Sequence, residues 1–222
     1  MNINIQKLIG KAVLDDKQSQ YELSQLFSKG KENCISYEES DGLCITDELK
    51  KDEVQSFYWL LKAAENGHQQ AMIDAADYYS NKIIECKLLY SFSDPIGIAE
   101  YYNSQKGYWL KKAIDLGNVK AVYKYALNFY NEGTYQEAFS HFKLAASKGY
   151  LPAINYLGNC YYFGRGVDKN YKKAVEYFEE ASNSGLKAAT ENLAMCYMKG
   201  NGVIADSERS KELFKLAKNQ HN

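Results

Sequence analysis

The sequence has few residues that break helices and few that bind metals. Only two of its 222 residues are proline and three are histidine. Because proline interrupts the hydrogen bonding of a helix backbone, its scarcity favours long helices. No histidine pairs with a cysteine or an acidic residue at the spacing of a metal site, so we expect no metal and no other cofactor. We also find no Ser/His/Asp arrangement and no phosphate-binding loop, and we expect no enzymatic activity.

Neither sign of charge is in surplus, since 27 Lys and Arg residues stand against 28 Asp and Glu residues. Non-specific nucleic-acid binding requires a basic surplus that displaces counterions, so no nucleic-acid partner is expected. No apolar run approaches the roughly 18 residues of a membrane helix, and the N-terminus lacks the shape of a signal peptide. We therefore expect no membrane insertion and a cytoplasmic location.

Tyrosine is abundant, with 20 residues, and an internal repeat fills nearly the whole chain. Four segments share an aromatic residue, an apolar residue, Lys or Glu, then Ala and a final Gly. Their glycines are Gly67, Gly117, Gly149 and Gly185. Each glycine is followed four residues later by an alanine that opens a second segment, and a weaker copy covers residues 19–30. Apolar residues recur at three- and four-residue intervals in both kinds of segment, which predicts five helix pairs that must stack to bury their apolar faces.

The ends of these helices carry capping signals. Thr134 to Glu137 has the pattern of a capping box, and Asp52 to Gln55 fits the same logic. Asn170 and Asp206 are expected N-caps, and the glycines closing the segments suit left-handed C-caps. Small residues occupy one equivalent position in four copies and predict a close approach of two helix backbones. They are Ala76, Ala126, Gly158 and Ala194.

Two stretches resemble a known family, the Sel-one-like repeat, a relative of the tetratricopeptide repeat. They are LGNCYYFGRGV (157–167) and LAMCYMKGNGV (193–203), each with a Gly-x-Gly-Val loop. The resemblance implies an all-α fold, a right-handed α/α superhelix (solenoid) of about five helix-turn-helix repeats. Residues 1–18 would form an N-terminal capping helix, and residues 19–222 the repeat domain.

Two copies contain insertions, near residues 31–53 and 81–105. The first is polar and acidic, and Asp41-Gly42 is an expected turn of a loop. The second is apolar and aromatic for a loop. It is either a lid that packs on the solenoid or an element that binds a partner.

The chain has five cysteines, which are Cys34, Cys44, Cys86, Cys160 and Cys196. An odd number without an export signal argues against a disulfide framework. Cys34 and Cys44 are expected to be reduced, although a disulfide within the loop stays open if the protein is exported. Cys160 and Cys196 occupy equivalent positions in successive copies and should be small buried core residues.

The first helix of each pair is expected to line a concave binding surface, as in other helix-pair solenoids. Transferring one helical register across the copies gives a set of side chains that we call the predicted strip. These are Tyr21, Gln25, Ile73, Asp77, Tyr123, Leu127, Tyr130, Asn155, Asn159, Tyr162, Glu191, Met195 and Met198. Tyrosine and methionine would supply adaptable apolar contact. The alternative for Tyr123 and Tyr130 is that they only pack between copies.

The resemblance implies an adaptor or scaffold that binds another protein. One such role is a bacterial immunity protein that neutralises a cognate toxin. A secreted effector or host-contact repeat protein is an alternative. An enzyme that binds or hydrolyses penicillin-like compounds is a remote alternative, since disulfide-bridged relatives have been described in that way and this chain lacks their bridges. No small-molecule substrate is expected.

Overall fold

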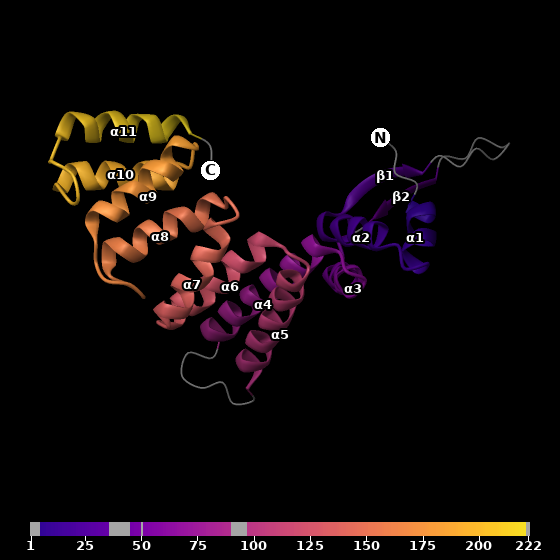
Figure 1. Ribbon diagram of the computed structural model, residues 1–222. Helices are drawn as coiled ribbons and strands as arrows, with labels where there is room; N and C mark the ends of the chain where they lie inside the picture. Colours follow the sequence, from indigo (N-terminus) through magenta and orange to yellow (C-terminus); the bar gives the residue numbers. More distant parts are fainter. Residues whose placement is uncertain (1–4, 36–44, 50, 90–96, 221–222) are drawn as a thin grey trace. The chain divides into compact units, whose positions relative to one another are not determined.

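The computed structural model describes residues 5–35, 45–49, 51–89 and 97–220, and most of them are helical (Figure 1). The chain divides into two units, residues 1–116 and 117–222, each of which is considered separately below. Helix pairs α2–α3 and α4–α5 belong to the first unit, and pairs α6–α7, α8–α9 and α10–α11 to the second. The expected all-α fold of five helix-turn-helix repeats is therefore confirmed.

The first unit contains five helices and two short strands among its described residues. They are α1 (Ile5–Val13), α2 (Lys17–Lys29), β1 (Lys31–Ile35), β2 (Ile45–Leu49), α3 (Glu53–Glu65), α4 (Gln69–Leu89) and α5 (Ile98–Asp115). Of the expected capping segment 1–18, residues 5–13 form α1 and the last two begin α2. Between these helices, Asp15 adopts a positive φ of 62° and Asp16 caps α2.

Both insertions contain more regular structure than the expected loops. In the first, β1 and β2 pair antiparallel, from Lys31 opposite Leu49 to Ile35 opposite Ile45. The β-branched residues of this stretch favour strands, but its polar, acidic composition had led us to expect a loop. The expected Asp41-Gly42 turn lies outside the described residues. In the second insertion, α4 continues to Leu89 and α5 begins at Ile98, because no glycine or proline interrupts residues 81–89.

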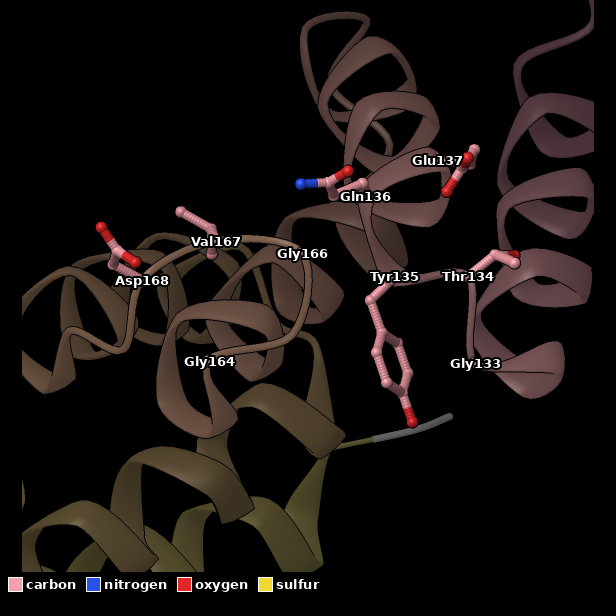
Figure 2. A pocket seen from close by; sticks show the side chains of 9 residues that line it. All are labelled: Gly133, Thr134, Tyr135, Gln136, Glu137, Gly164, Gly166, Val167 and Asp168. Atoms are coloured by element: carbon pink, nitrogen blue, oxygen red, sulfur yellow. The ribbon is translucent and has the colours of Figure 1, made fainter.

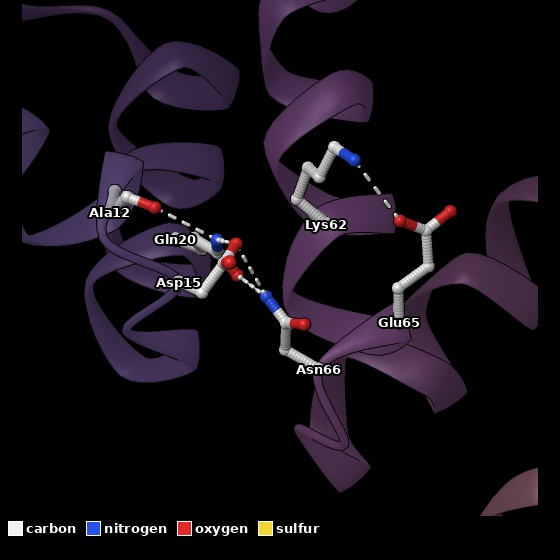
Figure 3. Close-up of polar contacts among 6 residues, drawn as sticks. All are labelled: Ala12, Asp15, Gln20, Lys62, Glu65 and Asn66. Carbon is white, nitrogen blue, oxygen red and sulfur yellow. Dashed lines mark hydrogen bonds and ion pairs between the residues drawn. The ribbon is translucent and has the colours of Figure 1, made fainter.

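A buried glutamine joins the start of the first unit to its third helix (Figure 3). Gln20 of α2 donates from Nε2 to the Ala12 carbonyl oxygen at 2.9 Å and approaches Asp15 Oδ1 at 3.4 Å. Its Oε1 accepts from Asn66 Nδ2 at 3.0 Å. Since Gln20 is almost fully buried, these bonds satisfy a side chain that would otherwise destabilise the core.

The second unit consists of three helix pairs. Its helices are α6 (Val119–Glu132), α7 (Tyr135–Ala146), α8 (Leu151–Phe163), α9 (Tyr171–Asn183), α10 (Lys187–Lys199) and α11 (Ser207–Asn219). Within this unit, α7 packs on α8 and α9 on α10, so consecutive pairs share a core. That core includes Phe142, Phe178, Cys160 and Cys196, all at most 1% exposed, which confirms the expected burial of both cysteines.

Three of the expected N-caps are confirmed and one is wrong. Asp52 accepts from the backbone N–H groups of the first turn of α3, and Asn170 and Asp206 do the same for α9 and α11. Thr134 makes no capping bond to α7. Its hydroxyl donates backward to the carbonyl oxygen of Phe129 at 3.0 Å, so the capping box does not form.

The glycine positions explain how the repeats fit together. A Cβ on Gly158 would lie 2.6 Å from Cδ1 of Phe178, so the space at this position holds an aromatic ring of α9 and not the expected second backbone. Gly166 and Gly202, the second glycines of the Gly-x-Gly-Val loops, both have positive φ. Each lies directly against the first residue of the second helix in the preceding pair, Tyr135 for Gly166 and Tyr171 for Gly202. These loops therefore form backbone contacts between consecutive repeats.

Candidate protein-binding surface

Part of the predicted strip surrounds a pocket between α8 and α10 of the second unit. Asn159, Tyr162 and Met195 line this pocket, which has a volume of about 160 Å³. Four further side chains complete it, and they are Phe163, Phe178, Asn192 and Lys199. We call this hollow the α8–α10 pocket. It brings residues from two repeats to one place, as a stacked pair of first helices should.

The amide side chains of the pocket are held by hydrogen bonds. Asn192 donates from Nδ2 to Asn155 Oδ1 at 2.9 Å and lies 3.4 Å from Asn159 Oδ1. Asn155 is only 5% exposed, so it holds Asn192 in place and is not a contact residue, contrary to its place in the predicted strip. The Tyr162 hydroxyl accepts from Asn201 Nδ2 at 2.6 Å. These bonds fix the orientation of the polar groups before any partner arrives.

The walls of the pocket are aromatic. The Tyr162 ring packs edge-on against Phe163 with centroids 4.9 Å apart and against Tyr171 at 5.0 Å. Phe178 lies deeper, at 6.5 Å from Tyr162, and is itself buried. Met195 is half-buried and Lys199 is exposed at the rim. The result is an apolar hollow with amides at its side and a cation at its edge.

Tyr123 and Tyr130 belong to an aromatic cluster inside the second unit. Both pack against Phe142 and Tyr156, with centroid separations between 5.5 and 5.9 Å. Burial raises the pKa of both phenols, in Tyr130 against the opposing effect of Arg165. Arg165 donates to the Tyr130 hydroxyl at 2.5 Å. Of the two interpretations left open, packing between copies accounts for these contacts.

The other strip residues of the second unit lie at the surface or at its edge. Leu127 is half-buried, whereas Glu191 and Met198 on α10 are exposed. Met198 retains 50% exposure, so it can contact a partner beside the α8–α10 pocket.

In the first unit the predicted strip is partly withdrawn from the surface. Ile73 is fully buried and cannot face a partner, because the α4 face that carries it packs into the core. Tyr21 stacks on His68 with centroids 4.2 Å apart and donates to Asp74 Oδ2 at 2.7 Å. Gln25 and Asp77 are half-buried. Tyr21 therefore serves first as a link between α2 and α4.

His68 is a structural residue of this link. Its Nδ1 accepts from the backbone N–H of Ala71 at 3.1 Å and thus caps α4, as the side-chain oxygen of Asn118 caps α6. Its Nε2 faces Gln18 Oε1 at 3.2 Å. Burial lowers the pKa of His68, with a smaller contribution from the charge of Lys17, and Asp74 opposes both. The environment therefore favours the neutral form of the ring.

A second hollow in the same unit as the α8–α10 pocket is larger and more open, with a volume of about 530 Å³ (Figure 2). The turn from Gly133 to Glu137 forms one side, and the loop residues Gly164, Gly166, Val167 and Asp168 form the other. No strip residue lines it. Figure 2 shows these two chain segments facing one another, with the side chains of Glu137 and Asp168 on opposite sides. It flanks the contact between repeats and offers no converging set of polar groups.

Two of the four pocket residues that the predicted strip missed share a helical register with one that it contained. Asn192 and Lys199 lie three residues before and four residues after Met195 on α10, so all three project from one face. Extending the predicted strip by one turn in each direction would have included them. Phe163 is the last residue of α8 and is exposed, and the helical periodicity of the sequence does not predict that it lines a pocket.

Neither a metal site nor a membrane-spanning element is apparent where the structure is described. No group of three or more His, Cys, Asp or Glu residues there is placed to hold a metal ion. None of the helices described combines the length and the hydropathy needed to cross a bilayer.

Solved structures with this fold confirm its class. A Sel1 repeat protein from Oxalobacter formigenes aligns with a TM-score of 0.70 and 24% identity, covering 98% of this chain and 79% of that one. The c5321 protective antigen of uropathogenic Escherichia coli, described as displaying an SLR fold, aligns at 0.51 and 23%, covering 100% of this chain and 50% of that one. Immunity protein Pa5087 from Pseudomonas aeruginosa aligns at 0.51 and 19%, covering 95% and 71%.

No curated protein sequence matches the chain. The family model of the Sel1 repeat matches five segments that together exceed half of its length. They are residues 17–68, 108–118, 119–150, 151–186 and 187–222. The Sel1 repeat is a protein-interaction fold, and this chain belongs to the Sel1 repeat family.

Proposed function

We propose that the chain binds a partner protein through the surface of α8 and α10 around the α8–α10 pocket. The observation that carries this proposal is an open apolar hollow whose polar side chains are already fixed by hydrogen bonds. Interfaces concentrate binding energy where aromatic and methionine side chains surround such hollows. Because Asn192 and Tyr162 are oriented before binding, less conformational entropy is lost when a partner docks.

We further propose that the partner is a toxin that this chain neutralises. Support comes from the similarity of fold to immunity protein Pa5087, which extends over 95% of this chain. A surface that is preorganised and lacks a catalytic arrangement suits tight, passive inhibition. The adaptor role is the more general form of the same proposal.

A capture experiment with matched variants tests the binding surface. Tagged wild-type protein, Met195→Glu and Leu144→Glu serve as baits in a lysate of the source organism, and bound proteins are identified by mass spectrometry. Leu144 is an exposed apolar residue on α7, so its variant controls for the added charge. We expect one stoichiometric protein on wild-type and Leu144→Glu baits and at least tenfold less on Met195→Glu. Equal capture by all three baits would place binding elsewhere.

The toxin part needs a separate measurement. The captured protein is expressed in a heterologous bacterium alone and together with the chain. We expect growth arrest with the partner alone and recovery on co-expression, and weaker recovery with Met195→Glu. A partner that is harmless by itself would refute neutralisation and leave the adaptor role.

A further inference from the structure

We propose that the α8–α10 pocket holds a single aromatic side chain of the partner, carried by a segment with acidic residues beside that side chain. This inference rests on the proposed function and specifies the chemistry that the pocket recognises. Three properties of the pocket lead to it, namely its size, the composition of its walls and the charge at its rim.

The volume of the pocket matches one aromatic ring. A cavity of about 150 Å³ lined by apolar side chains is known to accept benzene. The α8–α10 pocket has about 160 Å³ and is open to solvent at one side. One phenyl ring with its methylene group fills that volume, with the peptide backbone left at the opening.

The walls favour an aromatic occupant over an aliphatic one. Tyr162 and Phe163 of α8 and Phe178 of α9 contribute rings to the walls, and Met195 contributes its thioether. Offset and edge-to-face ring pairs contribute about 0.5–1.5 kcal/mol beyond their buried area, and sulfur–ring contacts contribute a similar amount. A branched aliphatic side chain could fill the space but would gain neither contribution.

The rim selects for negative charge. Lys199 is the charged residue among the seven that line the pocket, and it forms no ion pair with the residues that the structure describes. The acid nearest along α10, Glu191, lies eight residues away, which corresponds to about 12 Å of helix. A partner carboxylate beside the inserted ring would therefore meet a cation that has no competing acid in the pocket.

Methionine methyl groups give a direct readout of occupancy. The full chain is labelled with ¹³C at the methionine methyl groups. Met195 then reports from inside the pocket, Met198 from beside it, and Met72 from the core of the first unit as an internal reference. Three capped tripeptides are titrated, with the sequences Glu-Phe-Glu, Lys-Phe-Lys and Glu-Ala-Glu.

We expect Glu-Phe-Glu to shift the Met195 signal through the ring current of the inserted phenylalanine and to leave Met72 unchanged. Lys-Phe-Lys should bind less tightly, because its two lysines are repelled by Lys199. The reduction in affinity should be no more than about fivefold, since the charge at the rim is exposed to solvent. Glu-Ala-Glu should cause no shift. In Lys199→Glu the preference between the two phenylalanine peptides should reverse. We expect this variant to fold normally, because the Lys199 side chain is exposed.

Three results would overturn the inference. They are no movement of Met195 at peptide concentrations of about 10 mM, equal shifts with all three peptides, and an unchanged charge preference in Lys199→Glu. If any one of these results is obtained while Met195→Glu still loses the captured partner, only the chemistry of the pocket is wrong and the proposed function stands. If the peptides bind as expected but no partner depends on Met195, the proposed function fails on its own.

Discussion

Replacing Gly202 by alanine should destabilise the second unit more than its backbone conformation alone requires. Gly202 has a φ of 81°, where an alanine costs about 1–2 kcal/mol. A Cβ at this position would also lie 2.5 Å from the carbonyl carbon of Tyr171 and closer still to its oxygen. The obstacle is backbone at the start of α9, so it cannot rotate away as a side chain could. Overpacking of this kind costs a further 1–3 kcal/mol, roughly, which gives a total of about 2–5 kcal/mol.

Gly185→Ala is the matched control for this prediction. Gly185 lies in the same unit and has a φ of 88°, but a Cβ there would meet no atom within 4 Å. Its substitution should therefore cost only the conformational term of about 1–2 kcal/mol. The difference between the two variants isolates the contact between repeats.

Urea unfolding followed by far-UV circular dichroism measures both free energies. Because a repeat array can unfold in parts, amide hydrogen exchange in the first turn of α9 is measured as well. We expect exchange there to accelerate in Gly202→Ala and not in Gly185→Ala. If the two variants lose the same stability, the loop does not join the repeats in the way described.

Three further predictions concern His68, the two core cysteines and Tyr123. Because the folded state lowers the pKa of His68, its stabilising contribution is present above about pH 6.5 and is lost as the pH falls below that value, so the urea midpoint should drop between pH 7 and pH 5. Burial raises the thiol pKa to about 12 for Cys160 and about 11 for Cys196, so mass spectrometry should find neither thiol alkylated by iodoacetamide until the protein unfolds. Tyr123→Ala should lower the free energy of unfolding by about 3 kcal/mol because its ring packs in the aromatic cluster.

Each of these predictions has a control. His68→Asn should keep the helix cap, as Asn118 caps α6, and should remove the drop in the urea midpoint between pH 7 and pH 5. If the midpoint of this variant falls as much as that of the wild type, another group is responsible. Half-buried Cys86 should react faster than the two core thiols, and equal rates would contradict their burial. Tyr123→Phe retains the ring and should cost no more than about 1 kcal/mol. A neutral Tyr123→Ala would return that residue to the binding surface.

The repeat and its pairing were predictable from the sequence because they depend on local periodicity. Final glycines such as Gly185 mark helix ends through their conformational freedom, and the polar residues Asn170 and Asp206 mark helix starts. Thr134 misled for an equally local reason. Its hydroxyl had two acceptable partners, and the backward bond to Phe129 was formed in place of the cap.

The binding surface was only partly predictable because register alone does not determine burial. Asn159, Tyr162 and Met195 were expected at a surface, and they line one pocket. Ile73 shared their register but lies in the core, because the face of α4 that carries it is buried in the first unit. Which members of a strip remain accessible depends on neighbouring helices, and single-helix periodicity carries no information about them.

The extra length of α4 and α5 shows how a chain of this kind can diversify. With 21 residues, α4 exceeds the 13-residue α8 by about 12 Å of helix. The two long helices pack on one another, and the ring centroids of Tyr79 and Tyr102 lie 5.9 Å apart across their contact. Turns added to both helices of such a pair therefore find their support in each other. Evolution, or an engineer grafting an epitope, can alter the added turns of α4 and α5 while the surrounding modules keep their sequence and their fit.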